Sequence, residues 1–184
     1  MLSVDGDADA AVEARIRIGF EPRVRVWKQL VPLLTNKDVS LTMRGRLYTS
    51  CVRSSMLYGS ETWPVRKENV VALQRAEMRM VRWMCGVELK DRLPNKELRE
   101  GLGIDDIALV LQQNRLRWYE HVLRKDDDDW VKKCIEYEVE GPRPRGRLKR
   151  TWSEVVQEDC QARKLNKEDA MDRCKWRKMI KDVR

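Results

Sequence analysis

The sequence has few of the residues that break helices, form turns or bind metals. Its 184 residues include nine glycines, six prolines and one phenylalanine, so a sheet-rich design with many tight turns is not expected. The single histidine and five scattered cysteines form no Cys-x-x-Cys pair, and a zinc site needs clustered ligands. We therefore expect no metal. Buried, unpaired thiols in a reducing compartment, nuclear or cytoplasmic, are the ordinary interpretation.

Long apolar runs are also missing. No stretch of eighteen apolar residues occurs, so no membrane-spanning segment and no membrane partner are expected. The opening residues MLSVDGDADA have neither the basic flank nor the apolar core of a secretory signal. Residues 1–7 are acidic and contain glycine, and we expect a disordered leader there.

What the sequence does contain favours helices. Hydrophobic residues make up 42% and charged residues 37% of the chain, and Lys, Arg, Glu, Leu, Val and Met dominate. We predict an all-α fold of about seven to nine short helices, with no sheet of consequence. An apolar helical period runs from Asp9 to Asn36, where Pro22 either kinks one helix or opens a second. Ser40 is a candidate N-cap for the helix that follows.

Residues 46–85 hold two helical patterns around one sharp break. Gly59, Ser60 and Pro64 stop the first helix and require a turn. Tyr58 and Trp63 are expected to pack that corner against neighbouring structure. The first predicted stripe is Leu47, Cys51, Ser54, Ser55 and Tyr58, and the second is Val70, Leu73, Glu77, Met80, Val81 and Met84.

Capping residues mark most of the later helices. Gly86 should end the second corner helix, Pro94 should start a short one, and Asp105 or Asp106 should cap a long one. The run Asp126–Asp129 resembles a metal site only by composition, because consecutive carboxylates on a helix point in different directions. We interpret its last aspartates as a cap for a helix from Trp130. The last two helices are expected to be capped by Thr151 or Ser153 and by Asn166, and to be packed together by Trp152 and Trp176.

Positive charge is concentrated near the C-terminus. The net charge is +8, and residues 141–184 contribute +7 of it, with fourteen Lys/Arg against seven Asp/Glu. The segment GPRPRGRLKRTW carries five cations and no acid: Arg143, Arg145, Arg147, Lys149 and Arg150. Its prolines favour an extended backbone, which suits either insertion into a minor groove or neutralisation of phosphates. The alternative is a basic linker with no ligand.

Four sequence strings point to a family. In their order along the chain, they resemble the region downstream of the polymerase core in reverse transcriptases of non-LTR (LINE-type) retrotransposons. The strings are MLYGSETW with the following RMVRWMCG, then RLRWYEHVLRK, GPRPRGRLKRTW and DRCKWRKMI. The resemblance covers nearly the whole chain. It departs at Glu120, where relatives commonly have glycine, and no zinc knuckle of the kind found in some relatives is present.

The resemblance implies an organisation and a set of partners. It makes residues 8–85 a helical thumb beside a polymerase palm, 86–140 a helical connector, and 141–184 a basic nucleic-acid-binding region. DNA or RNA is the implied ligand, with Arg46 and Arg53 among the thumb cations facing it. No strand-flanked pair of metal-binding carboxylates occurs, so we expect a non-catalytic portion with no cofactor and no small-molecule substrate. Two alternatives to this interpretation remain open: a stand-alone nucleic-acid-binding remnant, and a protein with no selected function.

Overall fold

Helices form all the regular structure that is described. The computed structural model describes residues 8–20, 25–137 and 151–181, and within these ranges it contains no strand, so the predicted all-α fold is confirmed. Nine α-helices occur there, besides three short 3-10 helices, if α3, η1 and α4, which follow one another without a break, are counted as one. The chain divides into two compact units, one of residues 1–59 and 66–110 and the other of residues 60–65 and 111–184.

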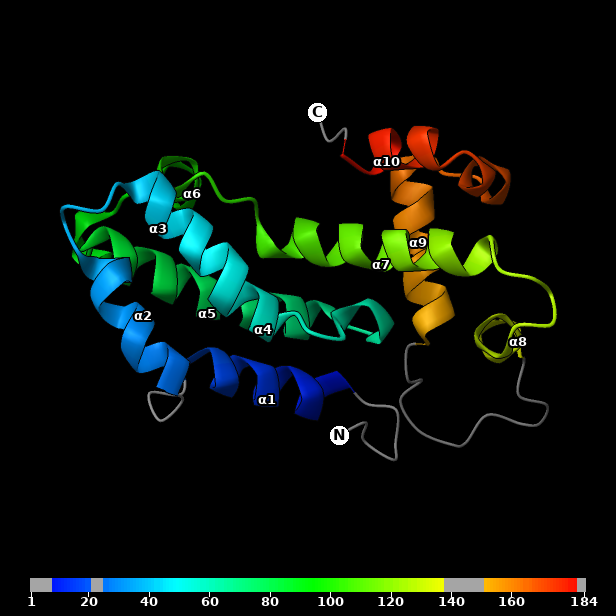
Figure 1. The fold of residues 1–184 in the computed structure, drawn as a ribbon, viewed down its shortest axis with the longest axis horizontal. Coiled ribbons are helices and arrows are strands. Elements are labelled where there is room, and N and C mark those ends of the chain that lie inside the picture. Colours follow the sequence, from blue (N-terminus) through cyan, green and yellow to red (C-terminus); the bar gives the residue numbers. More distant parts are fainter. Residues whose placement is uncertain (1–7, 21–24, 138–150, 182–184) are drawn as a thin grey trace. The chain divides into compact units, whose positions relative to one another are not determined.

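The first unit is a bundle built around α5 (Figure 1). Helix α3 contacts α5 and α6, α1 contacts α4 and α5, and α2 contacts α3 and α5. Its elements are α1 (Ala8–Phe20), α2 (Arg25–Thr35), α3 (Leu41–Leu47), η1 (Tyr48–Arg53), α4 (Ser54–Met56), α5 (Lys67–Cys85), η3 (Leu89–Asp91) and α6 (Asn95–Leu102), followed by the first turn of α7 (Ile107–Leu123).

Several helix ends lie where local chemistry predicts them. The Ser40 hydroxyl accepts a hydrogen bond from the Met43 amide at 3.3 Å and caps α3. Gly86 ends α5 in the left-handed conformation, with φ at 67°, which glycine adopts without a side-chain clash. The Asp106 carboxylate accepts from the Ala108 amide at 2.9 Å and starts α7. Because caps are interactions between near neighbours, they could be read from sequence.

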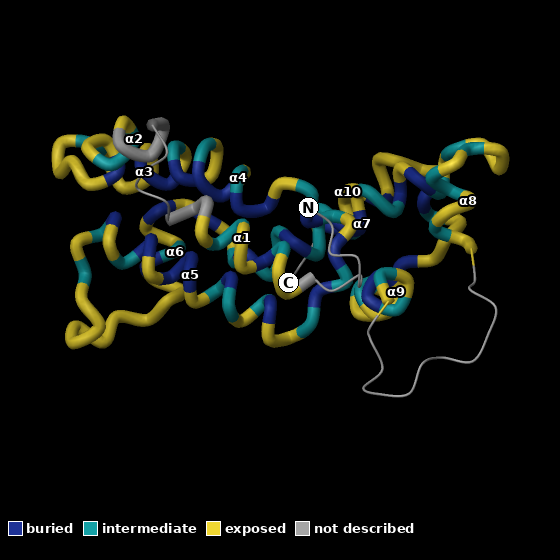
Figure 2. The backbone as a smooth tube through the Cα atoms, turned by 90° about the horizontal axis from the view of Figure 1, so that it is seen from below, coloured by how far each residue is buried: buried dark blue, intermediate teal, exposed yellow. Residues whose placement is uncertain are grey.

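The first predicted stripe was wrong, and the second is confirmed. In the helix from α3 to α4 the buried face is formed by Tyr48, Val52 and Met56, whereas Tyr58 is 71% exposed. Residues 48–53 form a π-helical turn, whose hydrogen bonds span five residues and shift the face that points inward. Trp63 is buried as expected. In α5, Leu73, Glu77, Met80, Val81 and Met84 are buried and Val70 is half-buried; Figure 2 shows the buried positions along this helix.

Helices α3 and α6 cross at a glycine. A Cβ placed on Gly45 would lie 1.9 Å from the backbone oxygen of Leu102, closer than any real contact of that kind. Only a residue without a side chain therefore allows the two backbones to approach this closely.

The second unit has a core of its own. It contains η2 (Ser60–Thr62), the part of α7 from Leu111 onward, α8 (Trp130–Glu136), α9 (Trp152–Arg163), η4 (Lys167–Met171) and α10 (Arg173–Lys181). Trp176 is fully buried and donates from Nε1 to the Leu116 carbonyl at 3.1 Å, which ties α10 to α7. The buried core is Leu116, Leu165, Ala170, Trp176 and Ile180, with Tyr119, Leu123, Cys160 and Met179 packed against it.

The end of the chain is divided where one helix was predicted. Asn166 and Asp169 form a capping box, but they cap the 3-10 helix η4 rather than the last α-helix. The Asp172 carboxylate then accepts from the amides of Cys174 and Lys175 at 2.9 and 3.0 Å and starts α10. An aspartate in this position offers the backbone an alternative to a continuous helix, and that accounts for the break.

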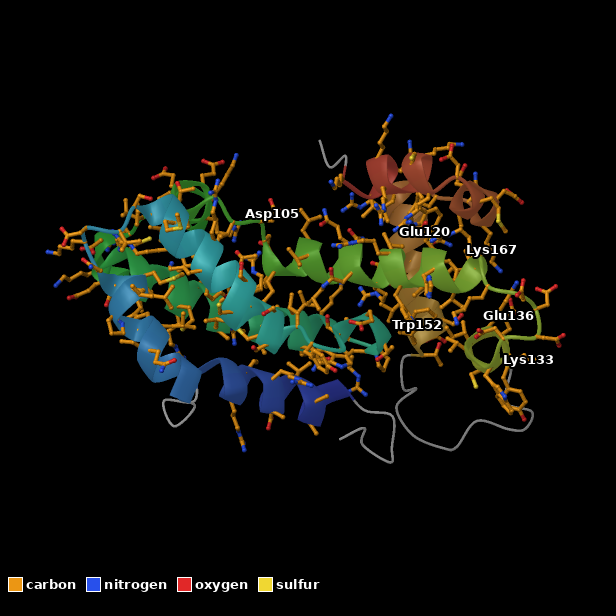
Figure 3. The ribbon with its side chains drawn as sticks, viewed as in Figure 1. Asp105, Glu120, Lys133, Glu136, Trp152 and Lys167 are labelled. Atoms are coloured by element: carbon orange, nitrogen blue, oxygen red, sulfur yellow. The ribbon has the colours of Figure 1, made fainter. Side chains whose placement is uncertain are left out.

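The acidic run before α8 serves as a cap and as ion-pair partners. Asp129 is the N-cap and accepts from the Val131 amide at 2.8 Å, as predicted. Asp127 pairs with Lys132 at 2.5 Å and Asp128 with Lys133, labelled in Figure 3, at 2.9 Å. Hydrogen bonding from Lys125 lowers the pKa of the Asp129 carboxyl below its usual value. Elsewhere, none of the helices in the described ranges has the length and apolar character needed to cross a bilayer.

Candidate nucleic-acid interface

The predicted basic segment lies outside the described residues. Arg143, Arg145, Arg147, Lys149 and Arg150 all belong to residues 138–150. The described chain resumes at Thr151, whose hydroxyl accepts from the Glu154 amide while the Glu154 carboxylate accepts from the Thr151 amide. The segment is therefore followed directly by a well-capped helix.

Trp152 fixes the start of that helix within the second unit. Its indole Nε1 donates to the Glu61 carbonyl at 2.7 Å, and its ring lies edge-on to Tyr119, with centroids 6.1 Å apart. Figure 3 labels Trp152 at the start of α9. Tyr119 also lies 6.5 Å from the ring of Trp176. The two tryptophans thus pack α9 and α10 through a shared tyrosine on α7, a residue that sequence reasoning did not single out.

Arg53, expected to face nucleic acid, is instead buried. Its side chain is 4% exposed, and its guanidinium donates to Glu77 Oε1 from Nε at 2.9 Å and from Nη2 at 2.6 Å. A further hydrogen bond from Nη2 reaches the Asp105 carbonyl at 2.6 Å. A guanidinium with its donors engaged in this way cannot reach a phosphate. No local pattern indicates this burial, because the partner carboxylate is 24 residues away.

Glu77 is the centre of a buried network. It also accepts from the Tyr48 hydroxyl at 3.1 Å and from the Ile107 amide at 3.2 Å, so it joins the π-helical turn to the start of α7. Tyr48 and Arg53 are five residues apart, and the π-helical turn between them is what lets both side chains reach one carboxylate. Burial raises the pKa of the Glu77 carboxyl, although Arg53 beside it acts in the opposite direction. The network is structural: it fixes helices rather than a ligand.

The other thumb arginines divide between core and surface. Arg44 is 8% exposed and donates to the carbonyls of Val39 and Met84 at 2.8 and 2.5 Å, so it is a structural residue. Arg46 is exposed, and its predicted contact with nucleic acid stays a prediction. Arg15 lies over the ring of Tyr58, 5.0 Å from its centroid.

The structure reveals a basic hollow that the sequence analysis missed. It lies in the first unit, has a volume of about 840 Å³, and is lined by α5, the segment that follows it and α6. Arg75, Arg79 and Trp83 recur every four residues along the exposed side of α5, so their side chains lie on one face. The signal was present in the string RMVRWMC, but its arginines and tryptophan were assigned only to a helix with an apolar stripe.

Positive charge predominates in this hollow. Four guanidinium groups and one carboxylate line it, a formal charge of +3. The carboxylate of Asp106 pairs with Arg99 at 3.1 Å, so its negative charge is engaged at one edge. Arg82 donates to neutral acceptors, the Asn95 side chain at 2.5 Å and the Met78 carbonyl at 3.4 Å, and its charge is not offset by them. The hollow therefore suits an anion.

A smaller hollow, of about 290 Å³, lies in the second unit. Trp118 and His121 line it with tilted rings whose centroids are 5.7 Å apart, and Glu61 also lines it. Arg117 is held by Asn114 Oδ1 at 2.9 Å. Within the described ranges, no group of three or more histidine, cysteine or acidic residues is placed to hold a metal ion.

Comparison with protein-family models, with curated proteins and with solved structures finds no match to this chain.

Proposed function

We propose that this chain is the thumb and post-thumb portion of a LINE-type reverse transcriptase, and that it holds template or target nucleic acid without carrying out polymerisation. The parent enzyme's palm domain would be its protein partner. The four strings that resemble this family support the assignment, and the helical architecture agrees with it.

One observation carries the nucleic-acid part of the proposal: four of the seven carboxylates in the C-terminal region are engaged in helix caps or ion pairs, whereas α10 exposes its cations. Of the seven carboxylates in residues 141–184, Glu154 and Asp172 cap helices, Asp159 accepts from Arg115 at 2.7 Å, and Asp169 pairs with Lys175 at 2.6 Å. The cations of α10 lie on its exposed side. Besides Lys175, which pairs with Asp169, they are Arg173, Arg177, Lys178 and Lys181.

This arrangement produces a positive surface rather than a neutral one. Trp176 and Ile180 hold the other side of α10 in the core, so the exposed side cannot turn inward without unfolding the unit. A fixed array of cations attracts polyanions and releases their counterions on binding. The acid-free basic segment of the same region adds five more positive charges in the sequence. That is the physical basis for a grip on phosphate backbones.

The test is binding of a fluorescent 20-base-pair duplex, measured by anisotropy from 50 to 300 mM salt. We expect the affinity of the wild-type chain to fall steeply with salt. Replacing Arg143, Arg145, Arg147, Lys149 and Arg150 with glutamine should remove most binding and reduce the slope of log affinity against log salt by up to about 0.9 for each lost phosphate contact. Unchanged affinity would make the segment a linker.

A matched control removes charge elsewhere. Lys90 and Lys96 are exposed on the first unit, with side chains 75% and 81% accessible, and their replacement by glutamine should leave duplex binding nearly unchanged. For the non-catalytic part of the proposal, primer extension with RNA and DNA templates should give no product above background. Nucleotide incorporation by the purified chain would refute that part.

A further inference from the structure

We propose that the basic hollow on α5 and α6 is a second binding site, which takes single-stranded nucleic acid by stacking an unpaired base on Trp83 and by pairing its phosphates with Arg75 and Arg79. The inference rests on the proposed function for the class of ligand, but it concerns a different surface from the basic segment.

The arrangement of α5 supports this ligand. Arg75, Arg79 and Trp83 share one face of the helix, and the indole is 39% exposed, so a flat partner has access to it. Cationic grooves interrupted by aromatic rings are the usual means of binding single strands, because phosphates and bases alternate along the ligand. A row of one type of group alone would not match that alternation.

Charge and composition argue against other ligands. The formal charge of +3 does not suit an apolar or cationic peptide. A duplex offers phosphates to the arginines, but its bases are stacked on each other and cannot stack on an exposed indole. The hollow also contains apolar side chains, among them Val71 and Leu89, which a base contacts more favourably than a sugar–phosphate edge does. A single strand satisfies all three features.

The decisive experiment separates base contacts from phosphate contacts. Anisotropy is measured for the full chain with labelled oligo(dT) of twelve residues, and with an abasic oligomer of the same length that keeps the phosphates. Trp83→Ala should weaken oligo(dT) binding roughly tenfold or more and should leave abasic binding unchanged. The double substitution R75Q/R79Q should weaken both ligands and reduce the salt slope by about 1.4, or 0.7 for each phosphate.

Matched variants exclude general effects. Trp130 on α8 is 79% exposed and lies outside the hollow, so Trp130→Ala should change neither ligand's affinity. Lys90→Gln with Lys96→Gln removes the same charge from the same unit and should leave the slope close to that of the wild-type chain. Circular dichroism of each variant shows whether it is folded.

The outcomes distinguish this proposal from the proposed function. If the hollow variants bind oligo(dT) as the wild type does, while the basic-segment variant loses binding, the second site is refuted and the proposed function stands. If Trp83→Ala weakens binding of oligo(dT) and of the abasic oligomer equally, base stacking is refuted. Displacement of oligo(dT) by oligoglutamate at equal charge concentration would show an acidic peptide site instead. If the wild type binds no nucleic acid, both proposals fail.

Discussion

Replacing Gly45 with alanine tests the close crossing of α3 and α6. The added Cβ would lie 1.9 Å from the Leu102 backbone oxygen and 2.9 Å from its carbonyl carbon. Real Cβ atoms stay about 3.0 Å or more from such atoms, so one backbone must move by about 1 Å. The neighbour is backbone within a helix rather than the end of a flexible side chain, and small adjustments cannot relieve the clash.

The expected magnitude is a balance of two effects. Overpacking of this kind costs about 1–3 kcal/mol, and a rigid backbone neighbour places Gly45 at the upper end. Alanine in place of glycine within a helix stabilises the folded state by about 1 kcal/mol. We therefore expect Gly45→Ala to reduce the free energy of unfolding by about 2 kcal/mol, which lowers Tm by about 4–8 °C in a chain of this size.

Gly101 supplies the control. It also lies within a helix, α6, but a Cβ there would contact only the end of the Leu41 side chain, at 3.8 Å. Gly101→Ala should therefore stabilise the protein by up to about 1 kcal/mol. Urea denaturation monitored by circular dichroism measures both variants. If Gly45→Ala is as stable as the wild type, the close approach of the two backbones is wrong.

Four further predictions concern buried and half-buried groups. Glu77→Ala should cost about 3–5 kcal/mol in urea denaturation because it removes the acceptor that the buried donors of Arg53, Tyr48 and Ile107 share, an acceptor that a protonated Glu77 still provides; replacing both Glu77 and Arg53 with apolar residues should recover most of that loss. Burial raises the pKa of Glu77, so protonation of this carboxyl favours the folded state. The contribution to the free energy of unfolding is complete below the ordinary carboxyl pKa and is lost as pH rises through the raised pKa of the folded state. Glu77→Gln should lack this part of the pH dependence. Burial raises the pKa of Cys160 to about 11, so at pH 8.5 iodoacetamide should modify it far more slowly than the exposed Cys134, as peptide mass spectrometry would show. Asp159→Asn should lower Tm without changing the slope of log duplex affinity against log salt. A steeper slope would show that Asp159 normally neutralises cations that contact the duplex.

Sequence was sufficient where the determining interaction is local. Ser40, Thr151 and Asp129 each satisfy an amide within three residues, so the pattern of residue types identifies them as caps. The apolar period of α5 similarly reports its buried face, because an α-helix repeats every 3.6 residues. These features fixed the all-α prediction and most helix boundaries.

Sequence was insufficient where the helix departs from that period. The π-helical turn at residues 48–53 brings Tyr48 and Arg53 to Glu77, a residue on another helix, and no local sequence pattern indicates this contact. The predicted stripe through Tyr58 therefore fell on the exposed side, and Arg53 was placed on the surface. The hollow on α5 was missed for a related reason: its lining comes from two helices and the segment between them, and their proximity follows only from packing.

The burial of Arg53 beside Glu77 bears on the interpretation of the basic segment. An arginine without a nearby acid in sequence is not thereby a surface residue, since its partner can come from a distant helix. For residues 143–150 the question is what it would cost to use a buried or half-buried carboxylate of the second unit, as Glu77 is used in the first. Asp159 is already bonded to Arg115 and Gln112, and Glu120 is paired with Arg124 at 3.0 Å.

These bonds make neutralisation of the segment by Asp159 or Glu120 costly. If a cation of the segment paired with Asp159, Arg115 would lose its carboxylate partner. The Arg115 side chain is 5% exposed, and a buried guanidinium without a carboxylate strongly destabilises the folded state. An external polyanion brings its own charges and needs no such exchange. This difference favours phosphate as the partner of the five cations, and it is why Asp159→Asn should affect stability and leave the salt dependence of binding unchanged.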